Sequence, residues 1–450
     1  MIGIFKAGSP EAEKRLAAVG GRLFNWSALI SAAGYRAASQ RVFGAVLAPD
    51  KAVRRVVADV RAGGDNAVRR YTLAFDGVDI PPARLAVTAE EFKAATKEVP
   101  AAFTKAMKTA IKNVRAFHDK VRPPAQVKIS PGFSRTNAPV AGAGIYIPGG
   151  TRGETPLVSS VYMNVIPAQA AGVPAICVCT PPGPGGRISP FILAALAACG
   201  IDKAFRIGGV QAIAAMAYGT ATVPAVDFIA GPGNLFVMLA KKEVYGKVGI
   251  DLLAGPSEIL VIADTTADAA LVAADLLSQA EHDPMASSIL VTPSARFAAA
   301  VDKELEKQVQ ALPRAGIVRA SMDAFGAAIV VRNLDEAVAV ADRVAPEHLE
   351  IMTAGAERVA AKIRNAGAIF LGPFTPEPIG DYIAGPSHTL PTGGTARFFS
   401  GLSTETFMKR TTTVALPKAR FAALAGDAME LAAREGLAAH RQALAIRGRR

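Results

Sequence analysis

The sequence predicts an α/β protein built from two Rossmann-like, doubly wound parallel sheets. The chain has 450 residues, more than one ordinary hydrophobic core accommodates, and 51% of them are apolar. Short apolar runs alternate with helix-period segments in two separate stretches, 140–250 and 257–371. Such alternation predicts parallel strands, because an intervening helix returns the chain to the same edge of the sheet and covers one of its faces.

The first stretch is expected to bind an anion. Its strands are predicted at 144–147, 175–179, 204–207 and 226–230, and its helices at 158–171, 190–199, 211–218 and 235–245. Glycine-rich turns follow three of these strands, at 148–150, 208–209 and 231–234. Glycines there let backbone N–H groups and helix N-termini approach a phosphate. The six-residue glycine fingerprint of dinucleotide sites is absent, so these turns alone indicate only a phosphate or carboxylate site.

The second stretch predicts another α/β unit. Its strands are expected at 258–263, 288–292, 328–331 and 368–371, with helices at 267–280, 295–311 and 334–344. Two such units predict a cleft in which a substrate meets a cofactor.

Helical segments flank the two sheets. Residues 1–45 form a weak helical pattern interrupted by two glycines, and we interpret them as an N-terminal arm. Amphipathic helices are predicted at 49–75 and 92–117, the second after a capping box of Thr88 and Glu91. The alanine-rich tail, 419–446, carries an apolar stripe too long to remain in water, so it must pack on another surface, such as a second subunit.

The composition argues against nucleic-acid binding, a membrane span and a secretion signal. The formal charge is +12, but the basic residues are scattered over helices, with a local cluster only at 447–450, and there is no Cys/His finger or RNA-binding aromatic pattern. No window approaches 18 uninterrupted apolar residues, and residues 1–10 lack a signal-peptide core. Cys177, Cys179 and Cys199 are expected to be buried core thiols, and their sparse, odd number suits a reducing cytoplasm.

Polar residues that suit a metal gather in the second half of the chain. Gln279 and His282 stand three positions apart at the end of a predicted helix and share one face, which indicates half of a metal site, although a helix that merely ends in polar residues has the same pattern. Glu347 and His348 are adjacent and suit two successive deprotonations. Asp381 lies in a glycine-rich loop that permits close approach to a ligand.

The chain resembles the histidinol dehydrogenase family over roughly residues 45–446. The segments that carry the resemblance occur in the family's order and at similar spacing: 144–150, 209–214, 231–234, 254–258, 278–282, 346–349, 380–382 and 388–392. The resemblance implies a zinc-dependent, NAD-linked enzyme that oxidises L-histidinol through L-histidinaldehyde to L-histidine, the last steps of histidine biosynthesis. It also implies a homodimer whose active sites are shared between subunits.

Matching motifs assign a role to each site residue. Glu347 and His348 would be the acid/base pair, with His348 deprotonating the alcohol and Glu347 activating water. The expected zinc ligands are Gln279, His282, Asp381 and, from the partner chain, His440. The expected substrate contacts are Ser257, Gln279, His282, His348, Asp381, His388, Glu435 and His440. The expected NAD contacts are Tyr146, Gln211 and Asn234.

The sequence pattern and the resemblance together divide the chain into four parts. Residues 1–45 would be the helical arm, and 140–250 the NAD-binding domain. Residues 46–139 would join 251–400 in a substrate and zinc domain, and 401–450 would form the dimerisation tail. The loop 151–155 is about three residues longer than the common family form, which puts the geometry of NAD binding in doubt. The basic charge also exceeds what the family leads us to expect.

Three other functions fit parts of the pattern. A related dehydrogenase acting on another small primary alcohol, such as a sulfonated diol, would keep the same acid/base pair, but His388 and Glu435 favour an amino alcohol. A catalytically dead sensor is disfavoured because every matched catalytic position is intact. A metallohydrolase gives no reason for the glycine-rich sheet. Gln, His and carboxylate ligands also accept manganese or cobalt, so the metal's identity is less certain than its site.

Overall fold

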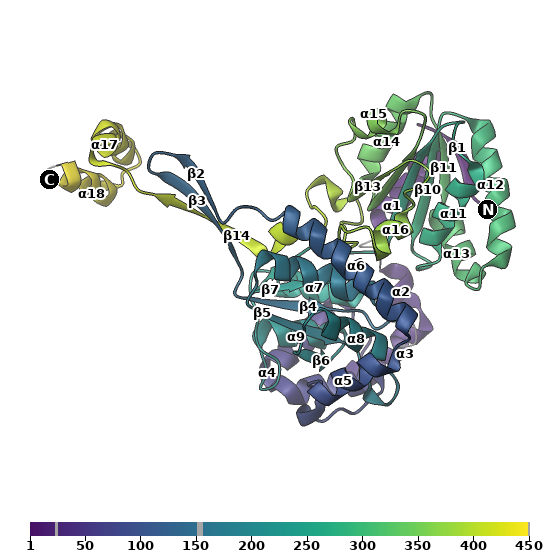
Figure 1. Ribbon diagram of the computed structural model, residues 1–450, viewed down its shortest axis with the longest axis horizontal. Coiled ribbons are helices and arrows are strands. Elements are labelled where there is room, and N and C mark those ends of the chain that lie inside the picture. The colour runs from purple at the N-terminus through teal and green to yellow at the C-terminus, as the bar shows by residue number, and fades with distance from the viewer. Residues whose placement is uncertain (23–25, 151–155, 449–450) are drawn as a thin grey trace. The chain divides into compact units, whose positions relative to one another are not determined.

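The computed structural model describes residues 1–22, 26–150 and 156–448 (Figure 1). The chain divides into two units: residues 1–121 with 140–407, and residues 122–139 with 408–450. The first unit contains two parallel sheets and the second an antiparallel sheet with two helices. This mixed architecture with parallel sheets confirms the predicted α/β class.

The five-stranded sheet of the first unit has the order β6-β5-β4-β7-β8, and every neighbouring pair is parallel. Its strands are β4 (Gly142–Tyr146), β5 (Ala175–Thr180), β6 (Ala204–Arg206), β7 (Phe228–Ala230) and β8 (Gly249–Ile250). The helices between them are α7 (Ser159–Ala171), α8 (Pro190–Ala198), α9 (Gly209–Tyr218) and α10 (Leu235–Val244). All four predicted strands and all four predicted helices are present, and no end is shifted by more than two residues. Cys177, Cys179 and Cys199 are buried and free, as predicted.

Three long helices that precede this sheet in the sequence pack against its helices. They are α4 (Pro49–Asp76), α5 (Ala89–Glu98), which begins with the predicted capping box, and α6 (Ala101–Lys120). Val53 and Val60 of α4 lie in one hydrophobic core with Cys177, Ile213 and Met238. We expected residues 46–139 to accompany 251–400. This core instead joins the α4 part of that range to the five-stranded sheet, because an amphipathic pattern predicts an apolar face but not the surface that covers it.

The six-stranded sheet has the order β1-β11-β10-β9-β12-β13 and is also parallel throughout. Its strands are β1 (Gly3–Lys6), β9 (Glu258–Ala263), β10 (Ser287–Thr292), β11 (Ala327–Val330), β12 (His348–Met352) and β13 (Ala368–Leu371). The helices are α11 (Ala269–Ala280), α12 (Ala295–Gln308), α13 (Ala315–Phe325), α14 (Leu334–Val344), α15 (Ala356–Ala360) and α16 (Glu377–Tyr382). The sequence did not predict β12 or α13.

The N-terminal segment is not purely helical, which corrects the prediction of a helical arm. It contains α1 (Pro10–Gly21), α2 (Ser27–Ser31) and α3 (Ala33–Phe43), but its first residues form β1 at the edge of the six-stranded sheet, paired with β11. The buried Ala12 and Val19 place α1 in the core on one face of this sheet. A four-residue edge strand supplies too little pattern to be predicted from sequence.

The second unit consists of β2 (Gln126–Ser130), β3 (Phe133–Pro139), β14 (Met408–Val414), α17 (Lys418–Arg434) and α18 (Ala438–Gly448). The strands are antiparallel in the order β14-β3-β2. In its two helices, which the sequence predicted as one tail, the exposed apolar residues include Leu424, Leu431 and Ile446. Over the described residues, no helix combines the length and apolarity needed to cross a membrane.

Candidate active site

The predicted acid/base pair lies at the amino edge of the six-stranded sheet. His348 is the first residue of β12 and stands opposite Ile259 of β9, so Glu347 comes beside Glu258 at the start of that strand. The Glu258 amide donates to Glu347 Oε2 at 2.9 Å, and the Glu347 amide donates to Glu258 Oε2 at 3.3 Å. Each carboxylate is therefore held by the backbone of the other residue.

Two oxygen acceptors hold the His348 ring. Its Nδ1 lies 3.0 Å from the Glu258 carbonyl oxygen and 3.0 Å from Gln279 Oε1. A ring nitrogen between two acceptors must carry hydrogen, so the neutral ring has its lone pair on Nε2. This Nε2 is buried, has no hydrogen-bond partner, and lies 3.5 Å from Asp381 Oδ1 and 3.9 Å from Glu377 Oε1. His348 thus turns its proton-accepting atom toward the acids of α16.

The electrostatics of this edge are dominated by burial and by the close carboxylates. Burial raises the pKa of Glu347 to about 8, although the neighbouring His348 opposes the shift. Burial alone would lower the pKa of His348, but Glu347 and Asp381 outweigh it and raise that pKa to about 10. Burial also raises the pKa of Glu377 to about 8. The raised pKa values keep these three groups protonated at neutral pH, and a cation bound among them would lower those pKa values and free His348 Nε2 to accept a proton.

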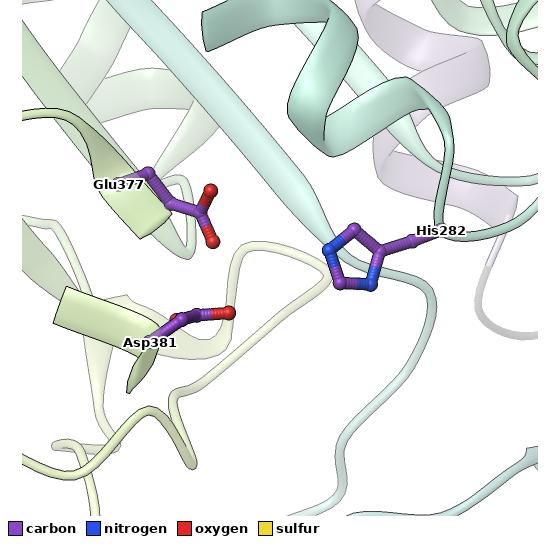
Figure 2. A group of neighbouring side chains, drawn as sticks. All are labelled: His282, Glu377 and Asp381. Carbon is purple, nitrogen blue, oxygen red and sulfur yellow. The ribbon is translucent and has the colours of Figure 1, made fainter. Parts of the chain in front are cut away.

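Three side chains can hold a metal ion together. One ligand atom from each of His282, Glu377 and Asp381 lies within 4.8 Å of the other two. Figure 2 shows both carboxylates of α16 pointing toward the His282 imidazole, which comes from the turn after α11. His282 is exposed and Glu377 is buried. Two of the four predicted ligands, His282 and Asp381, meet here.

Glu377 is a member of this group that the sequence did not predict. It begins α16 and stands four residues before Asp381, so both carboxylates share one face of the short helix. That spacing, next to the predicted Asp381, is the signal by which Glu377 could have been found. Glu377 Oε1 is buried without a hydrogen-bond partner.

Gln279 lies beside His348 in the structure. It is fully buried in the last turn of α11, its Oε1 contacts His348 Nδ1, and its Nε2 has no hydrogen-bond partner. Ser257, which precedes β9, is half-buried. His388 is also half-buried, and burial lowers its pKa while the Asp381 carboxylate opposes the shift.

The two predicted C-terminal site residues belong to the second unit. Glu435 follows α17 and His440 lies on α18, and both are exposed. The group of side chains around His348 is drawn entirely from the first unit. Their assignment to the site therefore stays a prediction.

The three predicted NAD contacts line one cleft of about 830 Å³ at the carboxyl edge of the five-stranded sheet. Tyr146 ends β4, and its hydroxyl accepts a hydrogen bond from the Gly209 amide at 3.1 Å. Asn234 caps α10 by accepting from the amides of Phe236 and Val237, at 3.0 and 3.2 Å. The cleft also contains Gly149, Gly150, Gly209 and Gly233. The predicted longer loop, 151–155, lies outside the described residues.

A half-buried carboxyl and a buried amide meet in the same cleft. Gln211 Nε2 lies 3.5 Å from Asp76 Oδ2, and Gln211 Oε1 has no partner. Burial raises the pKa of Asp76 to about 6. The Asp76 carboxyl therefore gains or loses its charge close to neutral pH.

A buried ion pair holds the turn after β7. Lys241 and Asp251 form a salt bridge and are both buried. Lys241 Nζ donates to the Gly231 carbonyl at 3.0 Å, and the Gly231 amide donates to Asp251 Oδ2 at 2.8 Å. Gly231 has φ 124° and its backbone packs against that of Tyr146, so no side chain fits there. The pair therefore fixes the turn that leads to Gly233 and Asn234 in the cleft.

Comparisons with known proteins identify the family of this chain. The family model described as histidinol dehydrogenase matches residues 45–448. Histidinol dehydrogenase of Nitratidesulfovibrio vulgaris is 51% identical over 89% of this chain and 93% of its own length, and that of Heliobacterium mobile is 48% identical over 88% and 92%. The crystal structure of histidinol dehydrogenase from Elizabethkingia anophelis is 37% identical, superposes with a TM-score of 0.85, and covers 89% of this chain and 92% of that one. This chain therefore belongs to the histidinol dehydrogenase family.

Proposed function

We propose that this protein oxidises L-histidinol through L-histidinaldehyde to L-histidine, with NAD as the hydride acceptor and zinc in the active site. The observation that carries the proposal is the His348 ring. Its Nδ1 is fixed by two acceptors, and its unpartnered Nε2 faces the acids that can hold a metal. Family membership supports the same reaction.

The residues of the first unit fit a zinc ion. His282 and Asp381 offer the nitrogen and oxygen ligands that zinc prefers, and Glu377 adds a third donor within the same 4.8 Å. Buried atoms without partners, Gln279 Nε2 and Glu377 Oε1, are what a site prepared for a further ligand would leave. Gln279 would join by turning its amide oxygen from His348 to the ion, and His440 of the partner chain would complete the predicted set. When bound, zinc would supply positive charge that offsets the carboxylates and orients the substrate's imidazole and amine.

The chain's own groups move the protons. His348 Nε2 would take the proton of the substrate hydroxyl in the first oxidation, while the hydrogen bond from Nδ1 to the Glu258 carbonyl keeps the ring oriented. Glu347 would remove a proton from the water that adds to the aldehyde before the second oxidation. The two residues are adjacent, with Glu347 Oε2 3.7 Å from His348 Nδ1, so both serve a single substrate.

The cleft at the five-stranded sheet would hold the cofactor. NAD bound there would supply the hydride acceptor, and a second NAD molecule would replace the first between the two oxidations. Glycines 149, 209 and 233 let the backbone approach a pyrophosphate, and the N-terminus of α10 lies at Asn234. Tyr146, Gln211 and Asn234 would contact the cofactor. Residues 140–250 would then be the NAD-binding domain.

The charge of the site favours histidinol over an anionic alcohol. The carboxylates of Glu347, Glu377 and Asp381 around His348 would attract an ammonium group and repel a sulfonate. Ser257, His388 and, from the partner chain, Glu435 would bind the amino alcohol.

The proposal is tested by NADH formation with zinc-loaded protein. Histidinol is compared with small diols, a sulfonated diol among them. Two NADH per histidinol, and none from the sulfonated diol, is the expected result. One NADH per histidinol, or faster turnover of a diol, would overturn the assignment.

The shared site is tested by complementation between subunits. We propose that the exposed apolar residues of α17 and α18, such as Leu424 and Leu431, are covered in a homodimer. His440→Asn and Glu347→Gln chains are each expected to be inactive, whereas their mixed dimers should recover part of the activity in one of the two sites. Verified mixed dimers without activity would contradict a shared site.

A further inference from the structure

Arg22 is a buried cation that comes from outside the region matched by the family model. It caps the C-terminal end of α1, is 4% exposed, and precedes the matched residues 45–448. Its Nη2 donates to Glu258 Oε1 at 2.7 Å and to the Pro256 carbonyl at 3.3 Å. The guanidinium also lies 5.7 Å from the centre of the Phe325 ring.

Glu258 connects this cation to both members of the acid/base pair. Its Oε1 accepts from the Gly393 amide at 2.8 Å as well as from Arg22, while its Oε2 accepts from the Glu347 amide. Its own amide donates to the Glu347 carboxylate, and its carbonyl accepts from His348 Nδ1. A displacement of Glu258 would therefore move Glu347 and His348 together.

Two neighbouring buried carboxylates need a compensating charge. Glu258 and Glu347 are 2% and 7% exposed, and like charges this close repel each other strongly in a medium of low polarity. Arg22 forms the salt bridge that the structure shows for Glu258. Removing it would leave Glu258 buried, charged and free to turn away from Glu347.

The arginine is also incompletely paired. Its Nε and Nη1 are buried without hydrogen-bond partners, next to residues that hold the acid/base pair. A buried guanidinium used only to fasten an arm would be expected to satisfy its donors, because each unpaired buried donor costs about 1–3 kcal/mol. The two unpaired donors of Arg22 are explained if its positive charge is needed beside Glu258.

We propose that Arg22 is a positioning residue of the active site, which acts through Glu258 to hold Glu347 and the His348 ring in their working geometry. The proposal rests on the function proposed above. It assigns to the N-terminal segment a part in catalysis rather than only in folding. Arg22 touches neither substrate nor cofactor, so its loss should lower kcat and leave both KM values nearly unchanged.

A matched control is present on the same helix. Arg15 of α1 also fastens the segment to the sheet domain, since its Nη1 donates to the carbonyls of Asp323, at 2.8 Å, and Ala324. Arg15 is half-buried, and no described interaction links it to Glu258. Arg15→Met therefore loses an anchor of α1 while keeping the buried charge.

The experiment compares Arg22→Met, Arg22→Lys and Arg15→Met in the zinc-loaded full-length protein. Histidinol oxidation and histidinaldehyde oxidation are measured separately at saturating NAD. Arg22→Met should lower kcat for the aldehyde step by about 10–100-fold, the range for residues that orient reacting groups through a contact. Arg22→Lys, which keeps the charge, should recover part of that loss. Arg15→Met should keep the wild-type kcat.

The double variant Arg22→Met/Glu258→Gln separates positioning from folding. It removes both buried charges, so it should unfold at a temperature near that of the wild type, yet it should retain the slow aldehyde step because one amide oxygen cannot serve both the Gly393 and Glu347 amides. A wild-type aldehyde rate in the double variant, or in folded Arg22→Met, would overturn the proposal. If the wild-type protein itself gives no NADH from histidinol, the proposed function fails instead, so the two failures are distinguishable.

Discussion

The two sheets of the first unit place their functional residues at opposite edges. The cleft with Tyr146, Gln211 and Asn234 lies at the carboxyl edge of the five-stranded sheet, where strands end and helices begin. Glu347 and His348 lie at the amino edge of the six-stranded sheet, where helix α11 ends and strands β9 and β12 begin. The first edge follows the usual rule for ligand sites in open α/β sheets, and the second does not.

The difference follows from the direction of the backbone dipoles. At a carboxyl edge the helices present their N-termini, as α9 does at Gly209 and α10 at Leu235, and free N–H groups there favour an anion. At an amino edge the helices present their C-termini. The carbonyl end of α11 points to Gln279 and His282, where partial negative charge favours a cation. The same architecture thus favours an anion at one edge and a cation at the other.

The substitution with the largest expected effect on activity lies at the amino edge of the six-stranded sheet. Glu347→Gln removes the proposed base for water while keeping the side chain's size, so aldehyde oxidation should fall by roughly 10²–10⁴-fold, the usual contribution of a general base. Histidinol oxidation should fall much less, and KM for NAD should stay unchanged, because the cleft belongs to the other sheet. Stopped-flow measurement of NADH from each substrate tests the division.

Glu281 supplies the control for this prediction. It follows α11 beside His282, and we expect it to be structural. Glu281→Gln should therefore keep both half-reactions. Equal losses of the two half-reactions in Glu347→Gln would remove the division of labour between Glu347 and His348.

The substitution with the next largest expected effect lies at the carboxyl edge of the five-stranded sheet. Lys241→Met leaves Asp251 buried without its partner, which typically costs about 3–5 kcal/mol of stability. It also releases the Gly231 carbonyl, so KM for NAD should rise while KM for histidinol stays near that of the wild type. Thermal unfolding with and without NAD, together with steady-state kinetics, measures both effects.

Lys247, which is exposed and lies in the turn after α10, provides a control with the same change in charge. Lys247→Met should alter neither the unfolding temperature nor KM. A Lys241→Met protein as stable as the wild type would show that the ion pair does not fix the turn.

Sequence patterns predicted the helices and strands whose function is packing. The strands of the five-stranded sheet are short apolar runs, and their burial follows from that composition. Strand β12 was not predicted, because His348 and Glu350, two residues apart, face the same side of the strand and interrupt its apolar run. These two polar residues, one of which is the candidate base His348, therefore concealed the strand from sequence analysis. Residues 126–139 are mostly exposed or half-buried, so they lack the apolar alternation that identifies a strand.

The candidate site was predictable where its residues are close in sequence. The spacing of Gln279 and His282 and the adjacency of Glu347 and His348 are local, whereas the contact of Arg22 with Glu258 spans 236 positions and depends on the fold. Glu377 could have been proposed from its spacing of four residues before Asp381, but only the fold shows that its short helix packs against β12, where its amide donates to Glu350 at 2.7 Å. Residues that meet only through tertiary structure leave no periodic signal.

The smallest expected effect concerns Asp76 in the cleft. Burial raises its pKa from 3.8 to about 6, so its protonated form stabilises the fold; that contribution is complete below about pH 4 and is lost as the pH rises through 6. Above pH 6 the ionised carboxylate would also repel the cofactor's pyrophosphate. Asp76→Asn should therefore lower KM for NAD roughly 2–5-fold at pH 8, which corresponds to about 0.4–1 kcal/mol, and leave it unchanged at pH 5.

The exposed Asp79, paired with Arg69, offers the control: Asp79→Asn should show no pH-dependent difference in KM for NAD. The ratio of KM for NAD in Asp76→Asn to KM for NAD in the wild type is therefore compared at pH 5 and pH 8. If this ratio is the same at both pH values, ionisation of Asp76 does not affect cofactor binding.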